Sequence, residues 1–187
     1  MTVEQPAGVR RGALVAALLL AAGISVTVGV VGRAHNPVYG DLPSFGFSSV
    51  PTFKAWTATL VLILAFFQLF SSLWLYGKLP LRAAPPSWLH NAHKVNGGIT
   101  FTLSLPVAAY CLYGFGFAPS PFSSRTLIHS LAGCLFYGAF GAKVLLVHSR
   151  RLPGWALPLA GGTLFTTIVV IWLTSARWYF SVVGLHG

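Results

Sequence analysis

The chain contains very few acidic residues. Of its 187 residues only Glu4 and Asp41 are acidic, whereas Lys and Arg together number 12 and the formal net charge is +10. Two carboxylates in the whole chain leave almost no material for paired-acid catalysis. The sequence also has no Gly-rich phosphate-binding loop and no nucleophile elbow. The absences therefore exclude several common classes of enzyme.

Cysteine is also scarce. Cys111 and Cys134 are the only two, and both lie within apolar runs. Their spacing matches neither a zinc-binding motif nor a CxxC redox motif. We therefore expect both to be small packing residues.

Charged residues of either sign make up only 7% of the chain, and 55% of the residues are hydrophobic. This composition is typical of an integral membrane protein in contact with a lipid bilayer. The basic residues stand at the ends of apolar runs and do not form a patch interleaved with aromatic residues. They indicate positive-inside anchoring, and no nucleic-acid partner is expected.

Five apolar runs are long enough to cross a bilayer as helices, for which about 20 residues suffice. We predict a single-domain, all-α membrane bundle with a four-helix core formed by spans two to five. A cleaved signal peptide is the alternative for the first run, but its apolar part exceeds the usual roughly 7–15 residues. The predicted spans are approximately 12–32, 55–76, 97–118, 126–148 and 155–176.

The basic residues near the span ends are distributed unevenly between the two sides. This bias predicts a multi-pass protein of the cell membrane, with the N-terminus in the cytoplasm and the C-terminus outside. The richer side carries Arg10, Arg11, Lys78, Arg82, Lys94, Arg150 and Arg151, and the other side carries Arg33, Lys54, Arg125 and Arg177.

Two histidines are placed symmetrically about the turn between the third and fourth spans. If that turn is centred between Ser120 and Pro121, His93 and His148 are equally distant from it along the chain. In an antiparallel hairpin they would lie at similar depth, as the two axial ligands of a low-spin haem do. The sequence therefore predicts a bis-histidine haem b site. We expect Lys94, Arg150 and Arg151 at the same membrane face to pair with the haem propionates.

The third span carries a stripe of small and polar residues on one helical face, namely His93, Gly97, Thr100, Ser104 and Cys111. Lipid-facing surface should be apolar, so this stripe is expected to face the bundle interior. In the fourth span, Gly133, Gly138 and Gly141 would let a neighbouring helix or a flat ring approach. A glycine one turn after a ligand, as in His-x3-Gly, would leave space for a porphyrin.

Other interpretations of the histidines stay open. His93 and His148 could be interfacial residues that reach the membrane surface, and His90 could replace His93 as a ligand. His129 lies at the opposite face, and its reflection through the turn falls at Leu112, beside Cys111. It could bind a second haem together with His35, or serve a structural or proton-handling role.

Three segments carry a resemblance to known membrane proteins: HKVNGGITFTLSLP, HSLAGCLFYGAFGAK and LPGWALPLAGG. They resemble an uncharacterised actinobacterial membrane family over roughly Trp88 to Trp178, and that family is similar to the cytochrome b-561 and ferric reductase class. The resemblance implies a four-helix core with one or two bis-histidine haems, carried by His93, His129 and His148. HNAHKVNGG is also similar to the haem-binding anchor of succinate dehydrogenase, but five spans differ from the three of that anchor.

These observations lead to two functional hypotheses. The first is a b-type cytochrome that exchanges electrons with quinol or with a redox protein, as a membrane oxidoreductase. The second is a cofactor-free subunit that anchors or assembles a larger membrane complex, because catalytic groups are scarce and spans three and four have small-residue faces.

Overall fold

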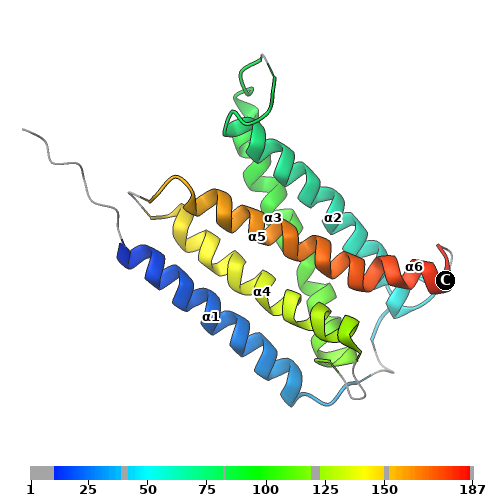
Figure 1. The fold of residues 1–187 in the computed structure, drawn as a ribbon. Coiled ribbons are helices and arrows are strands. Elements are labelled where there is room, and N and C mark those ends of the chain that lie inside the picture. The colour runs from blue at the N-terminus through cyan, green and yellow to red at the C-terminus, as the bar shows by residue number, and fades with distance from the viewer. Residues whose placement is uncertain (1–10, 39–41, 82, 119–122, 150–151, 186–187) are drawn as a thin grey trace, which may run out of the picture.

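The computed structural model describes residues 11–38, 42–81, 83–118, 123–149 and 152–185, and these residues form helices and connecting loops without β-strands (Figure 1). Five helices are long and apolar enough to cross a membrane. The predicted all-α membrane bundle is thus confirmed. In chain order the helices are α1 (Arg11–Ala34), α2 (Val50–Leu75), α3 (Trp88–Ala109), η1 (Tyr110–Phe115), α4 (Ser124–Val147), α5 (Ala156–Trp172), η2 (Leu173–Arg177) and α6 (Trp178–Val183).

Local sequence signals explain where the helices begin and end. Ser49 and Ser123 cap α2 and α4, each accepting a hydrogen bond from the backbone N–H three residues later. A serine at this position satisfies a donor that the first helical turn leaves unpaired. Gly116, with φ of 77°, follows η1 in a conformation that favours glycine. The third span begins at Leu89, earlier than position 97, because the LHNAHKVN segment is helical as expected.

Helix α4 is the centre of the arrangement. It packs between α1 and α5, while α3 packs on α2, and α2 also contacts α5 (Figure 1). The central apolar cluster joins side chains of α2, α3, α4 and α5, which confirms the predicted four-helix core. Its buried members are Val61, Ala65, Phe136, Ala139, Leu164 and Ile168, and Leu103 of α3 packs against them.

Two of the α4 glycines, Gly138 and Gly141, accommodate a neighbouring helix and not a flat ring. A Cβ atom at Gly138 would collide with the Ala21 carbonyl oxygen and the Ser25 hydroxyl of α1, and one at Gly141 would collide with Ile24. Ser25 also donates a hydrogen bond of 3.0 Å to the Cys134 carbonyl. Close approach of backbones through small residues is the usual way in which helices associate in a membrane. These contacts attach α1 to the four-helix core.

Two segments of the spans are π-helical. The first, η1, continues α3, and the second, η2, links α5 to α6. Pro106 lies inside α3, four residues before η1 begins, and it has no N–H to donate to the helix. Single π-helical turns within α-helices often occur at functional sites. Both segments line the same cavity, as shown below.

The close approach of α1 and α4 predicts that Gly138→Ala destabilises the protein. An added methyl group would force the backbones apart, at a cost of about 1–3 kcal/mol for overpacking. Thermal unfolding in detergent, followed by circular dichroism, measures this effect. Gly162→Ala is the matched control, because Gly162 is helical, exposed and has no neighbour within 4 Å of the added atom. Equal melting temperatures for both variants would contradict the packing described.

Candidate functional site

Side chains fix the register of α3 against α4. The rings of Phe101 and Phe140 are stacked, with centroids 3.8 Å apart and planes inclined by 10°. The hydroxyls of Ser104 and Tyr137 lie 3.1 Å apart, and Tyr137 also donates to the Ser104 carbonyl at 3.0 Å. In both pairs the two residues are equally distant from the midpoint between positions 120 and 121. The symmetric antiparallel hairpin predicted from the sequence is therefore confirmed, although the turn at 119–122 lies outside the described residues.

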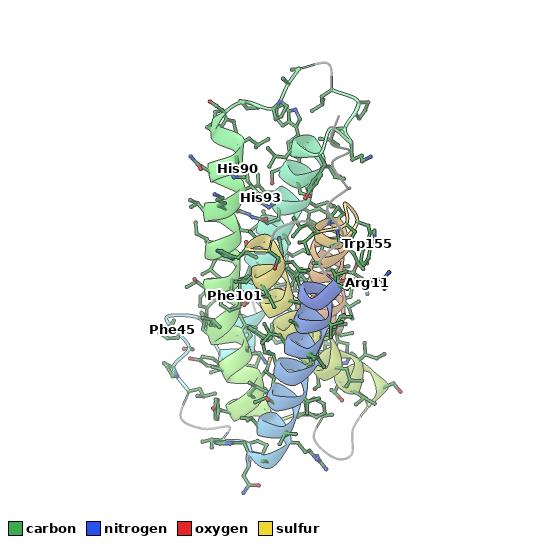
Figure 2. The ribbon with its side chains drawn as sticks, turned by 90° about the vertical axis from the view of Figure 1, so that its left-hand side faces the viewer. Arg11, Phe45, His90, His93, Phe101 and Trp155 are labelled. Carbon is green, nitrogen blue, oxygen red and sulfur yellow. The ribbon has the colours of Figure 1, made fainter. Side chains whose placement is uncertain are left out.

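The same register brings the first turns of α3 and the end of α4 to one end of the bundle. His93 lies eleven residues before Ser104, and His148 lies eleven residues after Tyr137. Eleven residues rotate a regular helix by about three turns and 20°, and advance it by about 16 Å. For regular helices this spacing would bring His93 and His148 to similar depth on α3 and α4. Figure 2 shows His90, His93 and Phe101 in this order along α3.

His93 is held by two residues of α2. Its Nδ1 atom lies 2.8 Å from the Ser71 hydroxyl. This hydroxyl donates its proton to the Gln68 carbonyl, so its oxygen can accept from Nδ1. Gln68 in turn donates to the His93 carbonyl at 2.6 Å. No described residue forms a hydrogen bond with His93 Nε2. The half-buried ring therefore has a defined position and one open nitrogen.

His148 is the C-terminal cap of α4 and is exposed. Its Nδ1 atom lies 2.8 Å from the Val144 carbonyl, so Nδ1 donates and Nε2 carries the free lone pair. His90 is also exposed and has no hydrogen-bond partner among the described residues. Lys94 is exposed on α3 at this end. The predicted propionate partners Arg150 and Arg151 lie outside the described residues.

The space expected beside Gly97 is filled by protein. A Cβ atom there would lie 3.2 Å from the amide nitrogen of Gln68. The glycine of this His-x3-Gly motif therefore accommodates the side chain that holds His93, and not a porphyrin. The interior orientation of the stripe is nevertheless confirmed, since Thr100 and Ser104 are buried.

Lys143 is a cation inside the membrane-spanning helix α4. Its ammonium group interacts electrostatically with His93 across the space between α3 and α4. Glu4 and Asp41, the two acidic residues of the chain, both lie outside the described residues. A cation inside a span is costly unless an anionic partner or the interface is within reach. Lys143 is thus a candidate partner for an anionic group bound beside His93.

A cavity of about 320 Å³ lies at the opposite end of the core. Its wall includes His129 of α4, Cys111 of η1 and Thr174 of η2. His129 Nε2 lies 3.7 Å from the Cys111 sulfur, and His129 Nδ1 lies 3.2 Å from the Thr174 hydroxyl. Both ring nitrogens of His129 are therefore engaged. Gly133, one turn after His129, lines this cavity, and a Cβ atom added to it would meet no neighbour within 4 Å.

Two cations of the cavity wall are paired with aromatic rings. The Lys54 ammonium lies 3.9 Å from the Phe115 ring centroid. The Arg125 guanidinium lies 3.7 Å from the Trp178 ring centroid and donates a hydrogen bond of 2.6 Å to the Thr174 carbonyl. Aromatic faces attract cations where carboxylates are lacking. The described part of the chain contains no carboxylate side chain, so these rings stabilise the two charges.

One protein-family model matches this chain. A profile described as a family of unknown function (DUF6529) matches residues 14–187, nearly the whole chain. The chain belongs to the DUF6529 family. Neither the curated proteins nor the solved structures contain a match to this DUF6529 chain.

Sequence reasoning missed the partners of His129 in the DUF6529 chain. It placed the reflection of His129 at Leu112, next to Cys111 in the chain, and predicted no contact between His129 and the Cys111 thiol. It assigned no role to Thr174 or Lys54, because only the packing of α2 and η2 brings them to the cavity. His35, the suggested second partner, instead packs its ring against Tyr113 at 4.5 Å between centroids.

The hydrogen bonds between Tyr137 of α4 and Ser104 of α3 predict the effect of Tyr137→Phe. Loss of its hydroxyl removes the hydrogen bonds to Ser104 and should lower the free energy of unfolding by about 0.5–1.5 kcal/mol. Ser104 still donates to the Phe101 carbonyl, so no buried donor is orphaned. Tyr113→Phe is the control, since Tyr113 is exposed and its hydroxyl has no partner in the described structure. Chemical unfolding in mild detergent compares the two, and equal losses would rule out a specific contribution from Tyr137.

Proposed function

We propose that the DUF6529 chain is a membrane b-type cytochrome in which His93 and His148 are the axial ligands of one haem b. The observation that carries this proposal is the hydrogen bonding of the two imidazole rings. Each has Nδ1 engaged, by Ser71 or by the Val144 carbonyl, and each has Nε2 open. Metal-binding histidines characteristically use one ring nitrogen for the metal and bind the other to a polar group that fixes the ring.

The surroundings of the two histidines support the same function. The symmetric register of α3 and α4 supports equal depth for the pair. Lys143 and Lys94 would pair with the propionates, together with Arg150 and Arg151. The roles of Arg150 and Arg151 are proposed from the sequence alone, because both residues lie outside the described residues. When bound, haem b would supply reversible one-electron transfer.

The role of the protein is then to hold the ligands and to conduct electrons to partners. Ser71 fixes the His93 ring, and Gln68 fixes the backbone beside it. The electron partners would be quinol in the bilayer or a redox protein at the membrane surface. His129 is not assigned to a second haem, because Cys111 and Thr174 engage both of its ring nitrogens.

Absorption spectroscopy tests the haem directly. Protein purified after expression with haem supply should show the dithionite-reduced bands of haem b, and a pyridine haem assay should give about one haem per chain. His93→Ala and His148→Ala should each abolish the bands, since either change removes an axial ligand. His90→Ala is the matched control and should retain them, because exposed His90 lies one turn away on the same helix. An unchanged spectrum in His93→Ala would reject this ligand assignment.

A cofactor-free subunit of a larger membrane complex is the second candidate function. It is favoured by one observation, namely that Gln68 and Ile24 fill the space beside Gly97 and Gly141. A colourless protein that co-purifies with stoichiometric partners would support this alternative and reject the cytochrome.

We further propose that the His93 and His148 end faces the cytoplasm and that the C-terminus is outside. The excess of Lys and Arg at that end supports this orientation. Alkaline phosphatase fused after Gly187 should then be active, because it forms its disulfides only outside the cytoplasm. The same reporter fused after Ser149, before the fifth span, should be inactive. The reverse pattern of activities would overturn the orientation.

A further inference from the structure

The proton positions around His129 can be derived from Thr174. The Thr174 hydroxyl donates its one proton to backbone carbonyls of its own helix, at 2.7 Å from Val170 or 3.1 Å from Ile171. With its proton on either carbonyl, the hydroxyl accepts the hydrogen bond at His129 Nδ1. In this arrangement Nδ1 carries the proton, and the neutral ring presents a lone pair at Nε2.

That lone pair faces a thiol. Cys111 Sγ lies 3.7 Å from His129 Nε2, a contact in which the S–H group donates. Proteins activate thiols by a common arrangement. A base lies within hydrogen-bond reach of the nucleophile, and a third group orients the base. Cys111, His129 and Thr174 provide these three elements from η1, α4 and η2. The pairing depends on both π-helical segments.

The cavity gives access to this thiol and a means of stabilising negative charge. Cys111 lines the cavity of about 320 Å³ together with small apolar side chains such as Ala55, Ala58 and Val107. Lys54 lines the same cavity, with its ammonium over the Phe115 ring. A cation in the cavity can stabilise a thiolate, and it can stabilise charge that develops on a carbonyl oxygen during attack. An apolar lining favours a substrate with a hydrocarbon body.

We propose that Cys111 is a nucleophilic thiol that accepts a fatty acyl group from a thioester, with His129 as its base. His129 Nε2 takes the thiol proton, and the Cys111 thiolate attacks the acyl carbon. A new S–C bond forms at Cys111, and the bond from the acyl carbon to the donor sulfur breaks. The donor thiolate leaves with the proton from His129. One thioester replaces another, so the step needs no oxidant or reductant.

Alkylation kinetics test the activation of the thiol. Cys134 is the internal control, since it lines the same cavity and has no imidazole contact among the described residues. N-ethylmaleimide should alkylate Cys111 in a Cys134→Ser variant roughly 10²-fold faster than Cys134 in a Cys111→Ser variant, a typical contribution of a positioned base. His129→Gln should remove most of this advantage. Thr174→Val keeps the imidazole but loses its orienting group, and it should reduce the rate by a smaller factor.

Acyl transfer is tested with an alkyne-tagged palmitoyl-coenzyme A and the full chain in detergent micelles, where the donor reaches both ends of the bundle. Label released by hydroxylamine should appear on Cys111, persist in Cys134→Ser, and fall roughly tenfold or more in His129→Gln. Gel filtration and circular dichroism check that the variants are folded. Equal labelling of Cys111 and Cys134, or a rate unchanged in folded His129→Gln and Thr174→Val, would overturn the proposal. Because these readouts require no haem, they are independent of the cytochrome proposal.

Discussion

The contact between α3 and α4 is the constraint on which both candidate sites depend. The backbones of these two helices are bridged by side chains, above all by the stacked rings of Phe101 and Phe140 and by the hydroxyls of Ser104 and Tyr137. In a membrane, helices gain little from hydrophobic association, so packing and interhelical hydrogen bonds fix their register. A shift by one turn would move every facing pair of the hairpin by about 5 Å.

Helix α4 carries one histidine near each of its ends, and the structure treats them differently. His129 and His148 are 19 residues apart, which corresponds to about 28 Å along a helix. His148 retains an open nitrogen at the end where the basic residues gather. His129 uses both nitrogens within the core, between Cys111 and Thr174. The two ends thus present different hydrogen-bonding states of histidine, and each matches one of the two proposals.

The scarcity of acidic residues shapes the interior as much as the helices do. Lys54 and Arg125 lie over aromatic rings, and Arg125 also donates to a carbonyl that the π-helical η2 exposes. Buried cations need partners, and rings and backbone carbonyls serve where carboxylates are lacking. Lys143 has no hydrogen-bond or ion-pair partner among the described residues, and its charge opposes a positive charge on His93. It therefore remains available to an anionic ligand.

The sequence by itself determined the membrane class, the five spans and the symmetric hairpin register, because hydrophobic run length and spacing about a turn are local properties. It also identified the interior face of α3 from a helical stripe. Only the tertiary structure decided which groups pack against the small residues. Helix α1 packs against Gly138 and Gly141, and the Gln68 side chain packs against Gly97. The neighbour of a glycine depends on packing between distant segments. The triad of Cys111, His129 and Thr174 likewise arises from three segments that only the folded bundle brings together.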